Sequence, residues 1–419
     1  MSDRLAVARA AVLDIYRAGV AAVAGRGAVA RALTEDAAGL GDGCDLIAIG
    51  KASVAMAEGA RDVLGDAIGR GLVITKHGYA SNHTLDARYR ILEAEHPVPG
   101  PRSLAAGADL LDFCAGLAPG RPVLCLISGG ASSLVEALPP GMCLAELRRL
   151  NQLLLASGLD ILRMNALRKA VSRLKAGRLG VRLCGHPVEG LLISDVPGDD
   201  PAAVGSGLLV ASASVPVTEV PIEVEQLLAA VELPPRPDAD ALKHVRIRIV
   251  AGQTQARAAA ASRARALGFA VTVHPDLLEG EASAVGARLV DQLRQSPPGV
   301  QVWGGEPVVN LPSTPGQGGR AQHLALAAAR ALEGVSDVLL LAAGTDGSDG
   351  PTDDAGAVVD GETCARGRRH GLDPSDALAR FDAGRFLAAS GDLLRTGPTG
   401  TNVMDLVIGL RLAASEARP

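Results

Sequence analysis

The stretch that decides the fold class is Val338-Leu339-Leu340-Leu341-Ala342-Ala343, followed directly by Gly344-Thr345-Asp346-Gly347-Ser348-Asp349-Gly350-Pro351-Thr352-Asp353-Asp354-Ala355-Gly356. The apolar run is typical of a buried strand, and the glycines after it permit positive φ angles and close approach of a ligand to the backbone. Carboxylates thus lie on a loop at the end of a core strand, an arrangement that suits a metal ion or a polyoxygenated substrate. A glycine-rich turn with solvated aspartates is the alternative interpretation.

Similar apolar runs recur along the chain and alternate with segments of helical periodicity. Strands of continuous Val, Ile and Leu character separated by helices predict largely parallel sheets covered by helices, with ligands at the carboxyl ends of the strands. The expected fold class is therefore α/β. The predicted strands are residues 45–50, 71–75, 122–128, 190–194, 245–252, 270–274, 301–304, 338–343 and 406–412.

The composition supports an α/β protein with more than one domain. Hydrophobic residues make up 48% of the 419 residues and aromatic residues only 2%, so Ala, Val, Leu and Ile must build the cores. A chain of this length is expected to form two or three domains. Five prolines punctuate the weakly periodic stretch 215–240, which we interpret as the connection between an N-terminal domain, residues 1–235, and a C-terminal domain, residues 241–419. An excursion within one domain is the alternative.

Charge and cysteine usage argue against several classes of function. A net charge of −5 and a pI near 5.9 speak against a surface that binds nucleic acid. The six cysteines lack Cys-x-x-Cys spacing, which predicts buried thiols in a reducing compartment and no structural zinc. No apolar run reaches the roughly 18 residues that a membrane span needs, and Asp3 and Asp14 interrupt the N-terminal segment. We expect a cytoplasmic protein that binds neither nucleic acid nor a membrane.

Two strand ends in the N-terminal half carry features of anion-binding sites. Lys51 follows the strand 45–50 at a turn into a helix, where an ammonium suits phosphate or carboxylate binding, although a lone lysine there is more often solvated. The strand 122–128 runs into Ser128-Gly129-Gly130-Ala131-Ser132-Ser133, whose N–H groups and hydroxyls suit a phosphate cradle. A tight structural turn is the alternative for this segment.

A polar helix face and a carboxylate loop come next along the chain. Helical periodicity places Asn165, Lys169 and Ser172 on one face, for which a solvated surface is the simplest interpretation. The strand 190–194 then ends in a loop that contains Asp195 and Asp199. Such a loop could hold Mg²⁺ or accept a proton, and a proline-bounded turn is the alternative.

The C-terminal half adds a cation and further polar groups. Glu306 lies at a glycine turn after the strand 301–304, and Arg320 opens a helix after two glycines. An arginine there can hold a phosphate or carboxylate through two parallel hydrogen bonds. Asn402 closes a loop of hydroxyl residues before the last strand. With the aspartate loops, these are the groups that Mg²⁺-dependent phosphoryl transfer requires.

The separated motifs occur in a recognisable order: Ile49-Gly50-Lys51-Ala52, Glu95-His96-Pro97-Val98-Pro99, the segments 128–133 and 194–201, Gly318-Gly319-Arg320, and the loops 344–356 and 396–402. In order and spacing they resemble the glycerate 2-kinases of the MOFRL type, and the resemblance covers essentially the whole chain. It implies an ATP-dependent, Mg²⁺-requiring kinase that phosphorylates D-glycerate at its 2-hydroxyl to give 2-phosphoglycerate and ADP. It also implies a larger, Rossmann-like N-terminal domain and a smaller C-terminal domain, with the active-site cleft between them, in a monomer or homodimer.

The resemblance also predicts roles for individual residues. Lys51, Asp195 and Arg320 are the expected catalytic residues, and which carboxylate is the base and which binds the metal stays open. Contacts with ATP are expected from Ser128, Gly129, Gly130, Ser132, Ser133, Asn165, Lys169 and Glu306. Contacts with D-glycerate are expected from Lys51, Arg320, Asp346, Asp349 and Asn402. The expected metal ligands are Asp195, Asp199 and Asp346.

The chain departs from the family pattern beside some of these residues. Ala321 and His323 stand where Asn and Glu are usual, Ala170 replaces a usual His, and Leu208 replaces a usual Pro. Substrate choice and rate are therefore open. One alternative function is an NAD(P)H-dependent hydroxypyruvate reductase, against which the lack of a Gly-x-Gly-x-x-Gly after a strand speaks. The other is a nucleotide or metabolite sensor that has lost turnover.

Overall fold

The computed structural model describes residues 3–81, 83–212 and 220–413. The chain forms two compact units, one of residues 25–250 and a composite one of residues 1–24 and 251–419. Residues 215–219, part of the predicted connection between domains, lie outside the described residues.

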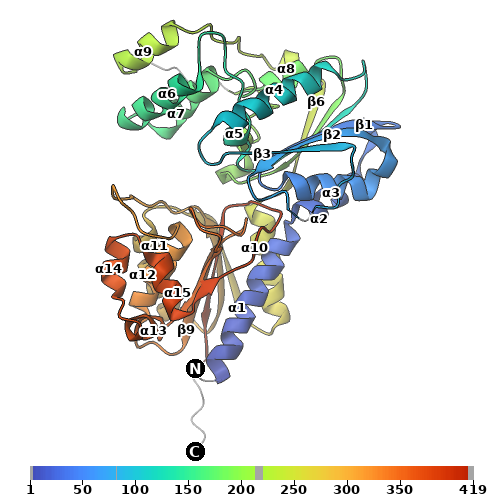
Figure 1. Cartoon of the computed structure of the whole chain (residues 1–419). Helices are drawn as coiled ribbons and strands as arrows, with labels where there is room; N and C mark the ends of the chain where they lie inside the picture. Colours follow the sequence, from blue (N-terminus) through green and yellow to red (C-terminus); the bar gives the residue numbers. More distant parts are fainter. Residues whose placement is uncertain (1–2, 82, 213–219, 414–419) are drawn as a thin grey trace, which may run out of the picture. The chain divides into compact units, whose positions relative to one another are not determined.

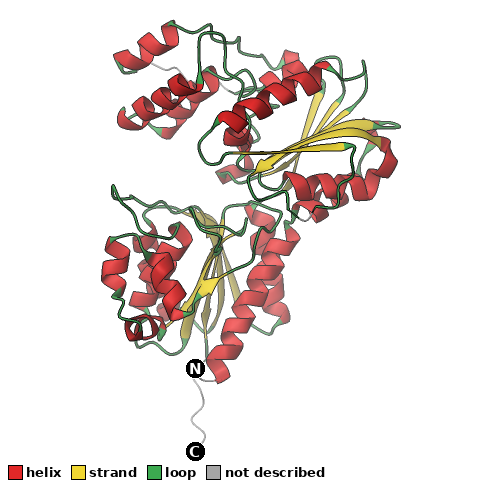
Figure 2. Ribbon diagram, in the orientation of Figure 1, coloured by secondary structure: helices red, strands yellow, loops and turns green. Residues whose placement is uncertain are grey.

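The 25–250 unit contains a six-stranded sheet in the order β3-β2-β1-β4-β5-β6 (Figure 1). The pairs β3–β2, β2–β1, β1–β4 and β4–β5 are parallel, and helices lie on both faces of the sheet (Figure 2). All six positions of β1 are buried as a result. The strands are β1 (Cys44–Ile49), β2 (Ile68–Lys76), β3 (Tyr89–Ala94), β4 (Val123–Ile127), β5 (Val188–Ile193) and β6 (Val245–Ala251).

The helices of this unit fall into two groups. One group flanks the sheet, and the other forms a small separate core in which Leu147, Leu150, Leu154, Leu167 and Val224 are buried. The flanking helices are α2 (Gly25–Glu35), α3 (Ser53–Leu64), α4 (Pro101–Ala115), α5 (Ala131–Leu134) and α8 (Arg178–Arg182). The separate group consists of α6 (Leu144–Ala156), α7 (Ile161–Ala170) and α9 (Ile222–Ala229).

The composite unit contains a second six-stranded sheet, in the order β11-β10-β9-β12-β8-β7. Here β7–β8 is the parallel pair, and the other four pairs are antiparallel. The strands are β7 (Val271–Leu278), β8 (Gly299–Gly305), β9 (Val338–Gly344), β10 (Gly356–Asp360), β11 (Leu393–Leu394) and β12 (Asp405–Arg411). The helices are α10 (Gln253–Ala266), α11 (Ala282–Gln295), α12 (Arg320–Ala331), α13 (Thr363–Arg369), α14 (Pro374–Ala379) and α15 (Ala383–Ser390).

The α/β class is confirmed, and every predicted strand overlaps a strand of the structure. The expectation of largely parallel sheets holds for the first sheet and is wrong for the second. The reason is the connection between strands: the aspartate loop leads from β9 directly into β10 without a helix, so the chain returns beside β9 in the opposite direction. Helices still cover β9 and β12 on both faces, since both strands share one core with α11 and α12 and another with α1 and α10. Both strands therefore have the continuous apolar character that suggests a parallel sheet.

The N-terminal helix α1 (Asp3–Ala22) belongs to the composite unit, whereas the sequence placed it in the N-terminal domain. Figure 1 shows it beside α10. Its buried residues Val12, Ile15 and Tyr16 join the core with Leu341 and Ile408 of the second sheet. The periodicity of α1 predicts an apolar face, but it cannot indicate which of two cores covers that face.

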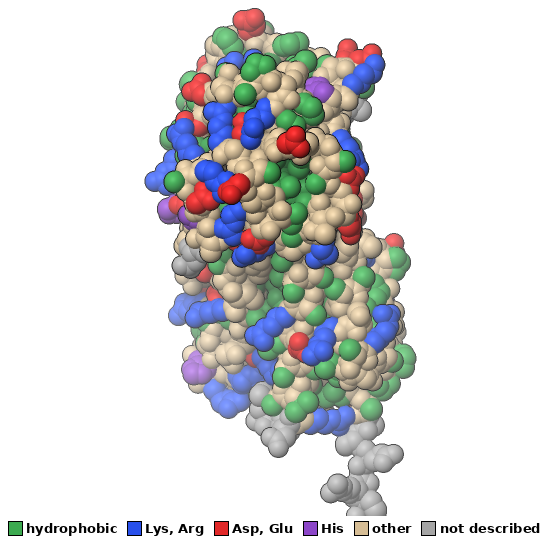
Figure 3. Space-filling model, turned by 90° about the vertical axis from the view of Figure 1, so that its right-hand side faces the viewer, with side chains coloured by type: hydrophobic (Ala, Val, Ile, Leu, Met, Phe, Trp, Pro, Cys, Tyr) green, Lys and Arg blue, Asp and Glu red, His purple; other side chains and the backbone are tan. Residues whose placement is uncertain are grey.

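Three further features concern the chain as a whole. All six cysteines are free thiols; four of them are buried, as predicted, whereas Cys143 and Cys184 are exposed. None of the helices in the described part of the chain is long and apolar enough to cross a membrane. On the surface in Figure 3, acidic and basic side chains lie next to each other in several places, in keeping with surface ion pairs such as Arg88–Asp86.

A pair of tyrosine variants tests the placement of α1. The hydroxyl of Tyr16 is buried and donates to the carbonyl oxygen of Gly344 at 2.6 Å. We expect Tyr16→Phe to lower the free energy of unfolding by about 1–2 kcal/mol, measured by urea denaturation. The matched control is Tyr89→Phe, because the buried Tyr89 hydroxyl has no hydrogen-bond partner among the described residues. An equal or larger loss in Tyr89→Phe would contradict the assignment.

Candidate active site

The carboxyl edge of the first sheet brings together two of the predicted segments. Strands β1 and β4 are neighbours, but the chain leaves β1 toward β2 and leaves β4 toward β5. Ligands in open α/β sheets bind at such a switch point. The loops after the two strands, which carry Lys51 and Ser128-Gly129-Gly130, therefore meet at the position where this fold class places its ligand.

Short hydrogen bonds hold these two loops together. The N–H of Lys51 donates to the carbonyl of Gly129 at 2.9 Å, and the N–H of Ala52 donates to the buried hydroxyl oxygen of Ser128 at 3.0 Å. Gly50 has a φ of +133°, and a Cβ there would lie 2.1 Å from the Ser128 hydroxyl oxygen. Only glycine at position 50 permits the two loops to approach each other so closely. The backbone hydrogen bonds between the loops then fix the position of Lys51.

The three predicted serine hydroxyls all have partners inside the unit. Ser128 accepts from Ala52, the hydroxyls of Ser132 and Ser206 are 2.8 Å apart, and Ser133 donates to the carbonyl of Gly130 at 3.1 Å. By contrast, the N–H groups of Gly129 and Gly130 donate no hydrogen bond to any described residue. These N–H groups and the half-buried Lys51 side chain are groups at this edge that can donate to an anion.

Lys169 and Asn165 contribute to structure through the contacts they make. The ammonium of Lys169 donates to the carbonyl of Ala202 at 2.8 Å and to the hydroxyl of Ser212 at 2.9 Å, and burial lowers its pKa. The amide oxygen of Asn165 accepts from Arg168 at 3.2 Å. Two of the three Lys169 donors are therefore committed to holding the chain next to α7.

The polar face predicted for this helix is shorter than expected, because α7 ends at Ala170. Ser172 is buried beyond its end and donates to Glu136 at 2.6 Å. The same carboxylate pairs with the buried ammonium of Lys175 at 2.6 Å. A buried ion pair that also accepts from a hydroxyl ties this segment to the region after α5, which a solvated helix face would not do.

The predicted carboxylates of this unit lie on the loop after β5. Asp195 is half-buried two residues past the strand, at the same edge as Lys51 because β5 is next to β4. Asp199 follows in a short turn with a φ of +52°. Among the described residues, no group of three or more His, Cys, Asp or Glu side chains is arranged to hold a metal ion.

In the composite unit, Arg320 is held by two carboxylates. Its Nε and Nη2 atoms donate to the two carboxylate oxygens of Asp405 at 2.7 and 3.1 Å, and Nη1 is paired with Glu306. Burial alone would lower the pKa of Arg320, but Asp405 and Glu306 outweigh it and raise that pKa. The guanidinium is therefore a fixed, permanently charged group, with its Glu306 side nearer to solvent.

Sequence reasoning missed Asp405, the first residue of β12, which is 4% exposed. The available signal was a carboxylate at the start of an otherwise apolar strand, directly after the loop that contains Asn402. An aspartate at that place is expected to be either a surface residue or a partner for a buried cation. The structure shows the second case.

Asp349 fixes the helix that carries Arg320. Its buried carboxylate accepts from the backbone N–H groups of Ala321 at 3.1 Å and Gln322 at 2.8 Å, which are otherwise unpaired donors in the first turn of α12. A Cβ at Gly319 would lie 2.1 Å from an oxygen of Asp349. The glycine before Arg320 therefore makes room for the carboxylate.

Asp346 lies beside this cluster. It is 5% exposed and accepts from the N–H of Ser348 at 3.0 Å. A Cβ placed on Gly344 would be 3.3 Å from one oxygen of Asp346 and 3.6 Å from one oxygen of Asp405. Burial and these two carboxylates raise the pKa of Tyr16 above its ordinary value. The first half of the aspartate loop is thus a buried carboxylate cluster, not a solvated turn.

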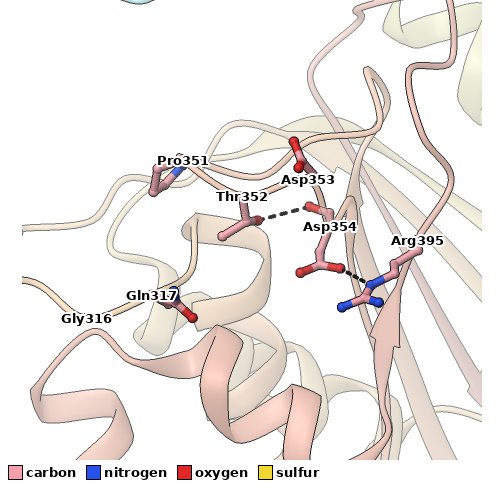
Figure 4. Close-up of a pocket in the computed structure, with 7 residues that line it drawn as sticks. All are labelled: Gly316, Gln317, Pro351, Thr352, Asp353, Asp354 and Arg395. Atoms are coloured by element: carbon pink, nitrogen blue, oxygen red, sulfur yellow. Dashed lines mark hydrogen bonds and ion pairs between the residues drawn. The ribbon is translucent and has the colours of Figure 1, made fainter. Parts of the chain in front are cut away.

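The second half of the loop faces solvent and lines a pocket of about 560 Å³ (Figure 4). Asp353 is exposed, and Asp354 accepts from Arg395 at 2.7 Å. Asn402 is half-buried on a loop that is attached to the aspartate loop, because the N–H of Thr399 donates to the backbone oxygen of Asp346 at 3.3 Å. The polar groups of Asn402 therefore belong to the same end of the second sheet.

The departures from the family pattern have structural environments of their own. Leu208 is buried in the core of the first sheet. His323 is buried in α12, where its ring stacks on Phe381 with centroids 4.4 Å apart. Ala321 contributes a backbone N–H to Asp349. The ion pairs of Arg320 are with Glu306 and Asp405, so they do not involve the side chains of Ala321 and His323.

Two family models match the chain, a domain of unknown function (DUF4147) over residues 11–235 and the MOFRL family over residues 299–405. A D-glycerate 2-kinase of Thermotoga maritima is 37% identical over 87% of this chain and 90% of its own length. The chain belongs to the MOFRL-type glycerate 2-kinase family. The resemblance drawn from the separated motifs is thereby confirmed.

Other relatives of this family extend the comparison. A glycerate 2-kinase of Pyrococcus horikoshii is 34% identical over 87% of this chain and 86% of its own. The crystal structure of the Thermotoga maritima glycerate kinase matches with a TM-score of 0.82 at 35% identity, over 97% of this chain and 100% of that one. An Agrobacterium vitis protein whose name proposes a hydroxypyruvate reductase is 38% identical over 87% of this chain and 98% of its own. The relatives thus carry both names that the sequence suggested.

The buried cap of α12 predicts a pH dependence of stability. Burial raises the pKa of Asp349 to about 7, Asp405 adds to the effect, and the N–H groups of Gln322 and Ala321 oppose it. The folded chain then keeps a proton that the unfolded chain has lost above pH about 4, so the free energy of unfolding should fall as the pH rises from about 4 to about 7. Asp349→Asn should flatten this decrease in urea denaturation across the same window.

The exposed aspartate of the same loop provides the matched control. Asp353→Asn should show the same pH dependence as the unmodified chain. Identical pH profiles for Asp349→Asn and the unmodified chain would contradict the protonation assigned to Asp349.

Proposed function

We propose that this protein is an ATP-dependent kinase that phosphorylates D-glycerate at its 2-hydroxyl, giving 2-phosphoglycerate and ADP. The observation that carries the proposal is the 37% identity to a D-glycerate 2-kinase over 87% of the chain, which spans both units. The geometry supports it, because each unit presents a positioned cation at the edge of its sheet: Lys51 in one and Arg320 in the other. Fixed cations and N–H donors stabilise the charge of a transferred phosphoryl group.

At the switch point of the first sheet, Lys51 and the N–H groups of Gly129 and Gly130 would bind an anionic oxygen. The bonds between the two loops hold these donors in position before the ligand arrives. Such preorganisation means that little structure must be ordered on binding. Asp195, at the same edge, is the carboxylate that would accept the proton of the 2-hydroxyl of glycerate.

In the composite unit, Arg320 would hold a carboxylate or phosphoryl oxygen. Asp405 occupies its Nε and Nη2 atoms, so the side toward Glu306 is where a ligand oxygen would bind. A ligand anion there would replace Glu306, which is the more exposed of the two carboxylates. Glu306 is therefore better suited to act as a counter-ion of the empty site than as a direct contact for ATP.

The chain offers few carboxylate oxygens as ligands for Mg²⁺. Mg²⁺ usually takes one or two carboxylates and completes its shell with phosphate oxygens and water. The buried oxygens of Asp346 and Asp405, which approach the same point near Gly344, fit that demand, and Asp346 is the residue that would hold the ion. When bound, Mg²⁺ would neutralise charge on the phosphate oxygens of ATP.

A hydroxypyruvate reductase is less well supported. A nicotinamide dinucleotide needs a close backbone approach at the switch point, which the Gly-x-Gly-x-x-Gly pattern provides, and the turn here is Gly50-Lys51-Ala52-Ser53. A lysine side chain at this position suits a phosphoryl or carboxylate group better than a pyrophosphate laid against the backbone. The sensor alternative differs from the kinase in predicting binding of ATP or glycerate without product.

The direct test is an incubation with ATP, Mg²⁺ and D-glycerate, followed by phosphorus NMR. We expect 2-phosphoglycerate and ADP to accumulate in equal amounts, and no oxidation of NADH or NADPH with hydroxypyruvate. The absence of any phosphoglycerate while ATP still binds would reject the kinase and favour the sensor. Appearance of 3-phosphoglycerate alone would show that the 3-hydroxyl of glycerate, and not the 2-hydroxyl, accepts the phosphoryl group.

Arg320→Lys tests the geometry of the second cation. Lysine keeps the charge but cannot pair with Asp405 through two parallel bonds. We expect kcat/KM for D-glycerate to fall by about 100-fold, the usual size for loss of one transition-state donor. The matched control is Arg263→Lys, since Arg263 also donates twice to one carboxylate, Asp14, but lies at the surface. Equal kinetics for the two variants would remove Arg320 from the proposed role.

A further inference from the structure

The motif Glu95-His96-Pro97-Val98-Pro99 is the part of the sequence pattern to which the proposed function gives no role. It follows β3, which is the edge strand of the first sheet. The carboxylate of Glu95 accepts from the N–H groups of Arg102 and Ser103, at 3.3 and 3.1 Å, at the start of α4. The segment is therefore a fixed part of the unit, tied back to the helix that follows it.

This motif carries His96 across the edge of the sheet. The glycine loop follows β4, and β2 and β1 lie between β3 and β4. Three strand spacings amount to about 14 Å, yet the His96 ring reaches the glycine loop. A Cβ on Gly130 would lie 3.2 Å from Nε2 of His96. The loop after β3 must therefore fold over the ends of the intervening strands and direct the imidazole to the switch point.

His96 and Lys51 flank the same open space. A Cβ on Gly130 would also lie 3.2 Å from Cγ of Lys51, and Gly130 has a φ of +84°, a conformation that glycine adopts without strain. The space that a side chain would fill is thus bounded by an imidazole on one side and the stem of a lysine on the other. The N–H groups of Gly129 and Gly130, which have no acceptor among the described residues, belong to the same loop.

These groups share one chemistry. An ammonium, two backbone N–H groups and an imidazole nitrogen all donate to oxygen, and an anionic oxygen gains most from such donors in a partly buried place. His96 and Lys51 are both half-buried, so a small ligand can reach their side chains. The ligand class that fits is therefore a phosphoryl or carboxylate group.

We infer that His96 is a ligand-contacting residue that donates from Nε2 to the anionic oxygen bound by Lys51 and the Gly129–Gly130 loop. The inference rests on the proposed function and deepens it, because a phosphate of ATP and the carboxylate of D-glycerate are the two sources of such an oxygen. The role assigned to His96 is to bind this oxygen.

Two measurements on the full chain test this role. The first follows the ring nitrogens of the histidines by NMR with nitrogen-15 labelling, while ADP or D-glycerate is added. The resonance of His96, assigned by its absence in His96→Asn, should shift with the ligand that supplies the oxygen. The resonances of His186, which lies before β5 at the opposite edge and pairs with the carbonyl of Arg121, should stay in place.

The second measurement is the KM–kcat split of His96→Ala and His96→Asn. We expect KM to rise about tenfold for one substrate, the size of a lost hydrogen bond to a charged group, and kcat to change much less. A rise for ATP indicates a phosphate and a rise for D-glycerate indicates the carboxylate. His186→Ala is the matched control and should keep both constants.

The outcomes separate this inference from the proposed function. If the unmodified chain forms no phosphoglycerate, the proposed function fails, but a ligand-dependent shift of His96 still supports the contact. If the unmodified chain is active while both His96 variants keep KM for both substrates and the His96 resonances do not move, the inference is overturned. The NMR measurement on the unmodified chain holds even where a variant fails to fold.

Discussion

The two-point ion pair between Arg320 and Asp405 is the contact on which the composite unit's site depends. It joins the first residue of α12 to the first residue of β12, a central strand between β9 and β8. Because Asp405 is buried, loss of its partner would leave an uncompensated charge, which costs several kcal/mol. The arginine is therefore held by the core of the sheet, and its direction follows from the register of β12.

The other elements of this end support the same contact. Asp349 caps α12 beside Arg320, Gly319 leaves room for that cap, and Tyr16 of α1 anchors the carbonyl of Gly344. The first sheet achieves the same result by a different means. There the backbones of two loops bond directly, and glycines allow the approach that fixes Lys51. In both units a cation is positioned before a ligand binds, which is the requirement for electrostatic stabilisation of a transition state.

The sequence predicted those parts of the fold that depend on local pattern. Continuous apolar runs identified the central strands, and glycine with polar residues after them identified the loops at the strand ends. It missed β3, whose Arg90 and Glu93 interrupt the apolar pattern of an edge strand, and β11, which has only two residues. It also missed β10, a strand of five residues that follows the aspartate loop directly. It could not distinguish antiparallel from parallel pairing in the second sheet, because strands buried on both faces look alike in either case. The sequence also could not predict which core α1 packs against, because helical periodicity does not identify the element that a helix contacts.

For the candidate site, as for the fold, the sequence predicted the features that depend on local pattern. Lys51, Arg320 and the aspartate loop were predicted as site residues because each lies at a glycine-rich strand end or helix start, and the structure places them at those positions. Their roles stay predictions. Asp405 was missed since a carboxylate at the start of an apolar strand does not by itself indicate whether it lies at the surface or pairs with a buried cation. The structural contacts of Lys169 and Ser172 depend on segments more than 30 residues away. Long-range partners of polar side chains are what a single sequence does not encode in any short pattern.

The measurement that tests the central claim most directly is a double-mutant cycle of Arg320→Lys and Asp405→Asn, read as kcat/KM for phosphorylation of D-glycerate. If Asp405 acts by holding the guanidinium, the double variant should be no slower than the slower single variant, because both changes remove the same contact. Effects that multiply independently would show that Asp405 and Arg320 act separately, and would contradict the dependence of the site on their ion pair.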